Sequence, residues 1–291
     1  MATGIIIIDK PQGWTSQDVA ARLRRVFGTR RIGHGGTLDP MATGILPVFV
    51  GRATRAVEFF EHAEKEYIAT LRLGLLTDTE DTSGTILETR PVEVGPQEVQ
   101  EILPKFLGKQ MQIPPMYSAV KIQGKKLYEL ARQGKTVERQ PRPIEIHELE
   151  LLGQEGNDYQ IRVRCSKGTY IRTLCKDIGL ALGCGGTMAA LRRSRAGAYG
   201  LFDAVELQAL LDRSEQGQEV ESLLLPIDSM FAQAPALELT SKQEKACRNG
   251  AAFSIALEPG QYRLYGTGEF LALGACDGTK MTTIKSFYEV N

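Results

Sequence analysis

The chain has 291 residues, 42% of them hydrophobic and 24% charged, a composition typical of an ordinary globular protein with one large domain or a large and a small one. Its apolar runs all fall short of the roughly 18 residues of a membrane span, so no membrane-spanning helix is expected. The 35 basic and 35 acidic residues cancel, but neutrality alone does not exclude a nucleic-acid ligand, because local patches matter more than the sum.

The cysteines indicate a reducing compartment. There are five of them, an odd number without C-x-x-C spacing, so we expect neither a disulfide framework nor a zinc site, and no metal. The isoleucines of 5–8 predict a buried strand rather than the apolar core of a signal peptide. Both observations lead us to expect a cytoplasmic protein.

An amphipathic helix is expected after this strand. Pro11 and Gly13 predict a turn, Thr15 or Ser16 is a suitable N-cap, and apolar residues follow at helical spacing. The polar side carries five basic residues against the single acid Asp18, and a solvated helix face is the simplest interpretation for each of them. Together they predict a phosphate-facing patch made of Arg22, Arg24, Arg25, Arg30 and Arg31.

The segment 33–44, with the sequence GHGGTLDPMATG, follows neither a helical nor a strand period and is expected to be a loop. Its glycines permit unusual backbone angles and close approach of a ligand, and Pro40 biases Asp39 toward an extended conformation. The loop would therefore present one carboxylate on a constrained backbone, with His34 nearby. Loops held between packed elements commonly carry function.

Beyond the loop, alternating patterns predict strands over 64–74 and 159–165, and helical spacing predicts helices over 96–107 and from near Thr169. The acidic segment 77–84 lacks the remaining pattern of a calcium-binding EF-hand and is expected to be a turn. From Leu237 onward, short strands and glycines predict a small β-rich domain.

A basic excursion lies between the predicted strands. Seven basic and two acidic residues occur from Lys121 to Arg142, bounded by Gly and Pro turns and accompanied by Tyr117 and Tyr128. This combination favours tracking of an RNA backbone, with base or ribose contacts from the tyrosines. The alternative is a solvated basic loop.

The loop around Asp39 resembles the catalytic motif G-H-T-G-x-L-D-P-x-A-T-G of the TruB-type pseudouridine synthases, with Gly35 where threonine is usual. The resemblance implies that Asp39 is the catalytic carboxylate and that His34 fills the position vacated by the extruded base. It further implies that Lys10, Pro11 and Gly36 support the loop.

Three further motifs extend the resemblance over about 230 residues. The K-x-Y motif implies that Tyr67 stacks on the target base, and K-G-T-Y-I-R-T-L implies that Arg172 pairs with Asp39, keeping it anionic, with Tyr170 beside the substrate. The L-R-R stretch implies that Leu191 packs beneath the base. The basic excursion resembles the RNA-binding insertion of the family, which gives Lys121, Lys125 and Lys126 a role in binding.

The resemblance implies an α+β pseudouridine synthase fold, with a mixed, mainly antiparallel sheet flanked by helices. We expect a catalytic domain over 1–232, with the RNA-binding insertion at 109–147, and a small PUA-like domain over 233–291. The implied reaction isomerises uridine 55 in the T-loop of tRNA without a cofactor, a guide RNA or a protein partner, by a monomer. Attack by Asp39 at C1′, attack at C6 and abstraction of a sugar proton remain open.

Two other functions are compatible with parts of this sequence. A catalytically silent RNA-binding or tRNA-folding protein could keep the basic surfaces without Asp39, and the intact carboxylate argues against it. A nucleotide-binding enzyme using 33–36 is disfavoured because neither a lysine–serine pair nor a Rossmann unit accompanies these glycines.

Overall fold

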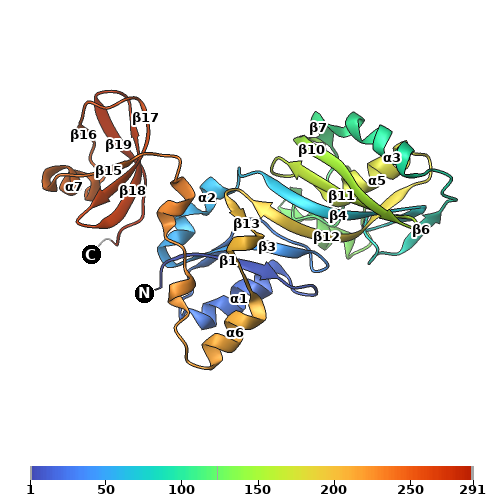
Figure 1. Cartoon of the computed structure of the whole chain (residues 1–291), viewed down its shortest axis with the longest axis horizontal. Helices are drawn as coiled ribbons and strands as arrows, with labels where there is room; N and C mark the ends of the chain where they lie inside the picture. Colours follow the sequence, from blue (N-terminus) through green and yellow to red (C-terminus); the bar gives the residue numbers. More distant parts are fainter. Residues whose placement is uncertain (1, 123, 290–291) are drawn as a thin grey trace.

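The computed structural model describes residues 2–122 and 124–289; Met1, Gln123, Val290 and Asn291, which fall within the predicted domain and insertion ranges, lie outside the described residues. A ten-stranded mixed sheet forms the centre of the molecule (Figure 1). Along its main path the strands are β14 (Ala204–Glu206), β1 (Gly4–Lys10), β3 (Thr43–Val50), β12 (Gly186–Ala196), β4 (Lys65–Leu73), β11 (Asp158–Cys165), β10 (Arg142–Glu155) and β7 (Gly108–Gln112).

Two short strands lie off this path: β2 (Ile32–His34) pairs with β3, and β13 (Tyr199–Gly200) pairs with β12. The pairs β1–β14 and β3–β12 are parallel, and the other pairs of this sheet are antiparallel. The predicted mixed, mainly antiparallel sheet is therefore confirmed.

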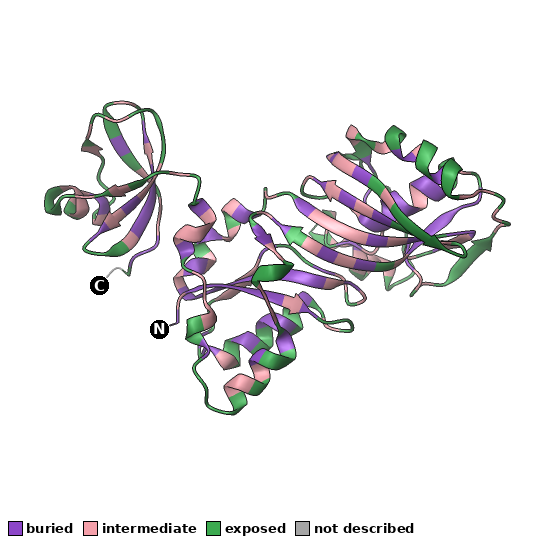
Figure 2. Cartoon of the chain, in the orientation of Figure 1, coloured by how far each residue is buried: buried purple, intermediate pink, exposed green. Residues whose placement is uncertain are grey.

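The first strand shows why the sheet is covered on both faces. Ile5 and Ile7 belong to one hydrophobic cluster and Ile6 and Ile8 to another, and all four are at most 1% exposed. Because successive side chains of a strand point to opposite faces, four consecutive isoleucines fit only a strand packed on both sides. The predicted buried strand is confirmed, with residues 4–8 buried in an unbroken run (Figure 2).

Most of the helices flank the central sheet (Figure 1). The longer ones are α1 (Ser16–Val26), α3 (Pro96–Ile102), α5 (Ile171–Ala181), α6 (Leu207–Glu215) and α7 (Ser241–Arg248), and the shorter ones are α2 (Val57–Phe60) and α4 (Leu127–Ala131). Short 3-10 turns complete them: η1 (Gly51–Ala56), η2 (Leu103–Phe106), η3 (Leu201–Asp203), η4 (Glu221–Leu223) and η5 (Ile227–Phe231). Among the residues described, no helix combines the length and the apolar character needed to cross a bilayer.

The start of α1 follows from its local sequence. The Thr15 hydroxyl accepts a hydrogen bond from the backbone N–H of Asp18, and the Asp18 carboxylate accepts one from the N–H of Thr15. This reciprocal capping satisfies N–H groups that the first turn leaves unpaired. It confirms Thr15 as the N-cap and fixes the register in which Val19 and Leu23 face the core.

The chain also forms two small hairpins, β5 (Leu75–Thr77) with β6 (Ile86–Thr89), and β8 (Lys121–Ile122) with β9 (Lys125–Lys126). A separate five-stranded sheet contains β15 (Ala236–Glu238), β16 (Phe253–Ser254), β17 (Gly260–Gly266), β18 (Glu269–Cys276) and β19 (Lys280–Ser286). Two helices lie away from the central sheet: α4 follows the β9 strand of the second hairpin, and α7 packs on the strands β16–β19 near the C-terminus (Figure 1).

The five-stranded sheet stands apart from the rest of the chain in Figure 1. Its Phe270 and Phe287 pack on Phe231, with ring centroids 6.2 and 5.9 Å away, and Lys285 pairs with Glu58 at 2.5 Å. The predicted β-rich C-terminal part is confirmed, and its PUA-like character stays a prediction.

Candidate active site

The loop that carries Asp39 connects β2 to β3, two antiparallel neighbours. Gly36 and Gly44 have φ values of +98° and +97°, in the region that favours glycine. A Cβ atom on Gly44 would lie 2.3 Å from the carbonyl oxygen of Arg193 in β12, so only glycine lets the two strands pair here. In between, the N–H of Ala42 donates to the carbonyl of Asp39 at 3.0 Å and closes a turn.

Asp39 and Arg172 meet at this loop. The Nε atom of Arg172 lies 3.0 Å from Oδ2 of Asp39, and the arginine side chain is 6% exposed against 38% for the aspartate. Arg172 also donates from Nη1 to the carbonyl of Thr79 at 3.1 Å and from Nη2 to that of Tyr117 at 2.7 Å. The guanidinium is thus fixed from three directions, and the carboxylate keeps an open side for a ligand.

The electrostatics of Asp39 differ from the sequence expectation. Burial raises the pKa of Asp39 above its ordinary value, although Arg172 acts to lower it, and Asp81 adds to the increase. An arginine partner alone predicts a lowered pKa, but here the loss of water around the carboxyl outweighs the ion pair. A raised pKa makes the ionised carboxylate a stronger base.

Tyr67 and Leu191 lie beneath the loop on neighbouring strands. In the antiparallel pairing of β4 with β12, Tyr67 is opposite Arg193 and Ala69 is opposite Leu191. Directly paired residues share one face of a sheet, so these four side chains form one surface. Tyr67 is half-buried, and burial raises the pKa of its hydroxyl. The site thus offers an aromatic ring and an aliphatic side chain beside a carboxylate.

Arg193, Lys10 and Lys65 are buried cations around the same loop. Arg193, 1% exposed, donates from Nε to the carbonyl of Ile45 at 2.6 Å and from Nη2 to that of Gly36 at 3.2 Å. It therefore holds the chain on both sides of Asp39.

The two lysines are also held by carbonyl oxygens. Lys10 Nζ donates to Trp14 at 2.7 Å, to Pro11 at 3.0 Å and to Pro40 at 3.4 Å, and Lys65 Nζ donates to Ala63 at 2.6 Å. Burial lowers the pKa of each lysine to about 8. Pro11, predicted to support the site, is itself exposed and contributes its carbonyl.

His34 and Tyr170 lie at the edges of the site. The Nε2 atom of His34 is 3.2 Å from the amide nitrogen of Gln17 in α1, and burial lowers the pKa of the imidazole. Tyr170 is the N-cap residue of α5, and its N–H and carbonyl are bonded to the side chain of Gln112, the last residue of β7. That amide fixes the start of the helix that carries Arg172.

Two family models cover most of the chain. The model described as TruB family pseudouridylate synthase (N terminal domain) matches residues 24–171, and that described as tRNA pseudouridylate synthase B C-terminal domain matches residues 172–232. The chain belongs to the TruB family. It is accordingly a pseudouridine synthase, an isomerase, and its pseudouridine synthase fold is the one predicted from the motifs.

Full-length similarity supports the same assignment. The chain is 45% identical over 276 residues to the tRNA pseudouridine synthase B of Aromatoleum aromaticum, which covers 94% of this chain and 89% of that protein. It is 45% identical over 289 residues to that of Syntrophomonas wolfei, with 97% and 96% covered. A solved chain in a Cbf5-Nop10-Gar1 complex matches with a TM-score of 0.74 at 28% identity, covering 99% of this chain and 85% of that one.

The structure explains the departure of this TruB-family chain at Gly35. A Cβ atom at Gly35 would lie 2.4 Å from Cδ1 and 2.7 Å from Cε1 of Phe60 in α2. Phe60 is 3% exposed and packs on the rings of Phe49 and Tyr199, with centroids 5.8 and 6.1 Å away. The Phe60 ring therefore occupies the space that a threonine side chain would need.

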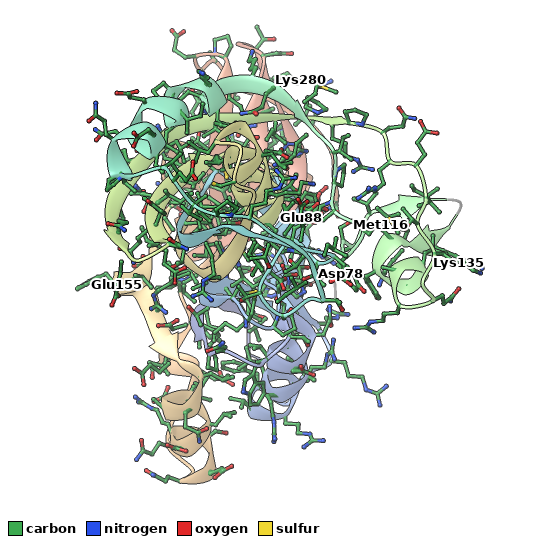
Figure 3. All side chains as sticks on the ribbon, turned by 90° about the vertical axis from the view of Figure 1, so that its right-hand side faces the viewer. Asp78, Glu88, Met116, Lys135, Glu155 and Lys280 are labelled. Carbon is green, nitrogen blue, oxygen red and sulfur yellow. The ribbon has the colours of Figure 1, made fainter. Side chains whose placement is uncertain are left out.

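The insertion of this TruB-family chain extends from the core at one side (Figure 3, where Met116 and Lys135 lie on it). Lys121 and Lys126 pair in the β8–β9 hairpin; Lys121 and Lys125 are exposed, and the half-buried Lys126 donates to the Tyr128 hydroxyl at 3.2 Å. The base of the insertion reaches the site through the bond from Arg172 to the carbonyl of Tyr117.

Sequence reasoning missed the roles of Arg193 and Lys65, although both lie in motifs it used. The available signal was a charged residue at a strand position next to apolar residues of the same parity. Tyr67 and Ala69 follow Lys65, and Leu191 precedes Arg193. Among the residues described, no cluster of His, Cys, Asp and Glu side chains is suited to hold a metal ion, and all five thiols are free and buried.

Proposed function

We propose that this protein converts uridine 55 in the T-loop of tRNA to pseudouridine, with Asp39 as its catalytic carboxylate. The observation that carries the proposal is the pairing of the partly exposed Asp39 with the buried Arg172, on a glycine-rich loop above Tyr67 and Leu191. The relatives named tRNA pseudouridine synthase B, similar over nearly the whole chain, support tRNA as the substrate.

The reaction breaks the N1–C1′ bond of uridine, turns the uracil and rejoins it through C5, so that no atom is gained or lost and no cofactor is needed. Asp39 serves as nucleophile toward C1′ or C6, or as base toward a sugar proton. Arg172 orients the carboxylate throughout, because its other donors are already fixed by backbone carbonyls.

The target base has to leave the RNA stack, at a cost of a few kcal/mol. Stacking on Tyr67 returns about 1–3 kcal/mol, with Leu191 packing beneath the base. His34, half-buried and neutral through its lowered pKa, is suited to fill the vacated position because an uncharged imidazole can stack without losing solvation of a charge.

The partner in this proposal is the T-arm of tRNA, bound by a monomer in the cytoplasm without a guide RNA. Lys121, Lys125 and Lys126 supply contacts to phosphates, and Tyr170 contacts the substrate beside Arg172. The two exposed lysines and the aromatic residues of the insertion suit an RNA backbone.

The test is pseudouridine formation in an unmodified tRNA transcript, comparing the native protein with Asp39→Asn. We expect product at position 55 with the native protein and none with the variant, while both bind the transcript. A transcript with cytidine at position 55 is the substrate control. Binding by both proteins without product would indicate an RNA-binding or tRNA-folding protein, and product from both would show that Asp39 is not the catalyst.

A further inference from the structure

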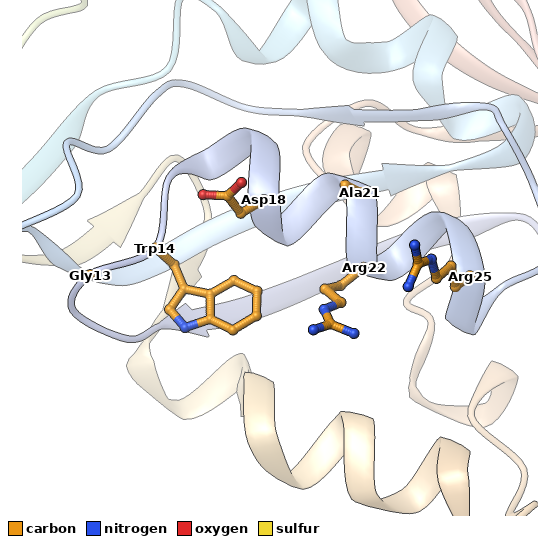
Figure 4. A pocket seen from close by; sticks show the side chains of 6 residues that line it. All are labelled: Gly13, Trp14, Asp18, Ala21, Arg22 and Arg25. Atoms are coloured by element: carbon orange, nitrogen blue, oxygen red, sulfur yellow. The ribbon is translucent and has the colours of Figure 1, made fainter.

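The N-terminal segment and α1 form a pocket outside the Asp39 site. It has a volume of about 460 Å³, within the roughly 300–1,000 Å³ of ligand pockets. Its walls are formed by Gly13, Trp14, Asp18, Ala21, Arg22 and Arg25 (Figure 4). Arg22 and Arg25 are three residues apart on the helix, which places them side by side, and both are exposed.

This pocket is physically connected to the catalytic loop. The N–H of Gly13 donates to the carbonyl of Pro40, the residue after Asp39, at 2.7 Å. The buried Lys10 donates both to the carbonyl of Trp14 and to that of Pro40. One wall of the pocket is therefore fixed directly to the backbone beside the catalytic carboxylate.

The chemistry of the pocket is that of an aromatic platform with positive charge. The Arg22 guanidinium lies over the indole of Trp14, 5.9 Å from the ring centroid, and Trp14 is only partly buried against the core. In Figure 4, Trp14 and Arg22 point to one side of α1 and Asp18 to the other. The Asp18 carboxylate accepts hydrogen bonds from the N–H and hydroxyl of Thr15, so its charge is directed to the helix cap.

We propose, on the basis of the proposed function, that this pocket binds a second nucleotide of the substrate RNA, distinct from the target uridine. The base stacks on Trp14, and Arg22 and Arg25 contact the adjoining phosphate. Stacking of a base on an aromatic ring is more favourable than an exposed cation–π contact between a guanidinium and the same ring. A base therefore displaces the guanidinium from the ring, and the freed guanidinium meets the phosphate, which it contacts with two donors.

Two features favour RNA over a free nucleotide. The pocket is open along α1. The exposed residue Arg24 on this helix, and Arg30 and Arg31 after it, extend the positive charge beyond the pocket, as an RNA backbone would require. Its wall is joined to the loop that receives the target base. An RNA strand with one base in the Asp39 site would thus bring a flanking nucleotide to this wall.

Trp14 is the only tryptophan in the chain, so the full-length protein carries its own probe. We would titrate it with unmodified tRNA transcript and with uridine monophosphate, recording tryptophan fluorescence and, separately, RNA retention on a filter. We expect the transcript to quench the fluorescence over the same concentrations at which it binds. Uridine monophosphate should quench only at concentrations at least a thousandfold higher.

Variants separate stacking from charge. Trp14→Leu should weaken transcript binding about tenfold, and Trp14→Phe, which keeps an aromatic face, should retain most of the affinity. Arg22→Ala should reduce the slope of log affinity against log salt by about 0.7–0.9. Lys105→Ala, an exposed cation in η2 at the other end of the sheet, is the charge control and should change neither quantity. Melting temperatures identify any variant that fails to fold.

Unchanged fluorescence at saturating transcript, or native affinity in Trp14→Leu, would overturn this assignment. Quenching by uridine monophosphate at the same concentrations as by transcript would overturn the RNA assignment in favour of a free nucleotide. The outcome is independent of the proposed reaction: product at position 55 without quenching refutes only this pocket, and quenching without product refutes only the reaction.

Discussion

Positive charge occurs in two different forms in this molecule, at the catalytic loop and in the insertion. Lys10, Lys65 and Arg193 are at most 8% exposed. Lys10 and Arg193 donate to backbone carbonyls of the loop that carries Asp39, and Lys65 donates to the carbonyl of Ala63. Lys121 and Lys125, on the β8–β9 hairpin, are exposed. The first group is held in place before any substrate arrives, and the second is free to move toward one.

The difference follows from solvation. A buried cation loses its hydration, and carbonyl oxygens replace water only in part, so burial lowers the pKa of Lys10 and Lys65 to about 8. In return these charges fix the backbone and are little affected by salt. An exposed lysine keeps its hydration, attracts phosphates from a distance and is screened within about 10 Å at 0.1 M salt. In the function proposed above, the loop cations would position the site, and the insertion cations would recruit the substrate.

Replacing Lys121, Lys125 and Lys126 together by alanine should give the largest effect that this comparison predicts. If each contacts a phosphate, transcript binding weakens roughly a hundredfold at 0.1 M salt, and the log–log salt slope falls by about 2 to 3. Turnover of bound substrate should stay unchanged, because none of the three touches Asp39 or Arg172 in the contacts described. Filter binding at several salt concentrations and single-turnover kinetics measure the two quantities.

Lys105→Ala controls for loss of charge in general. Native affinity combined with slow turnover in the triple variant would contradict the division of roles. It would mean that the insertion acts instead through the bond between Arg172 and the Tyr117 carbonyl.

Placing the family's usual threonine at position 35 tests how closely the Asp39 loop packs against Phe60. Gly35→Thr should destabilise the protein by about 1–3 kcal/mol, because the new Cβ would overlap the Phe60 ring, which cannot move without displacing Phe49 and Tyr199. Phe60→Leu opens space for the new side chain. The double variant should therefore lose less free energy of unfolding than the two single variants lose together, by at least about 1 kcal/mol. Urea unfolding measures all three; strictly additive effects would refute the proposed fit of Gly35 to Phe60.

The same pair shows where sequence reasoning ends. The strand of isoleucines, the Thr15 cap and the loop around Asp39 were predictable, because each is decided by a few neighbouring residues. The predicted loop bounds of 33–44 were too wide, because 33–34 belong to β2 and 43–44 to β3. The expectation that Asp39 meets Arg172 came from motifs rather than from spacing. The fit of Gly35 to Phe60 joins residues that no local pattern relates, and so escaped prediction.

Arg193 and the pKa of Asp39 escaped for a related reason. Arg193 reaches Gly36 and Ile45 only because β12 pairs with both β3 and β4. The raised pKa of Asp39 reflects burial by segments from several parts of the chain, which outweighs the one partner that the motif identified. A sequence motif can identify the partner of Asp39, but it cannot show how much water distant segments remove from around the carboxyl group.

A third effect, spread over two pH units, concerns the pH dependence of stability set by a buried loop cation. The pKa of Lys10 is about 8 in the folded protein and near 10.5 in an unfolded chain. Between these values the unfolded chain binds the extra proton, so this group makes the folded state more stable as pH rises, by at most about 1.4 kcal/mol per pH unit. Below pH 8 both states are protonated, and the cost of burying the charge is constant.

Lys10→Met should remove that dependence. From pH 8 to pH 10 the free energy of unfolding of the native protein should therefore rise relative to that of Lys10→Met. The difference in free energy of unfolding between the native protein and Lys105→Met, a change at an exposed lysine, should not change with pH. Urea unfolding at pH 7, 8, 9 and 10 gives both differences. A flat difference for Lys10 would mean that its ammonium is as well solvated by the three carbonyls as by water, and the contrast between buried and exposed cations would then rest on position alone.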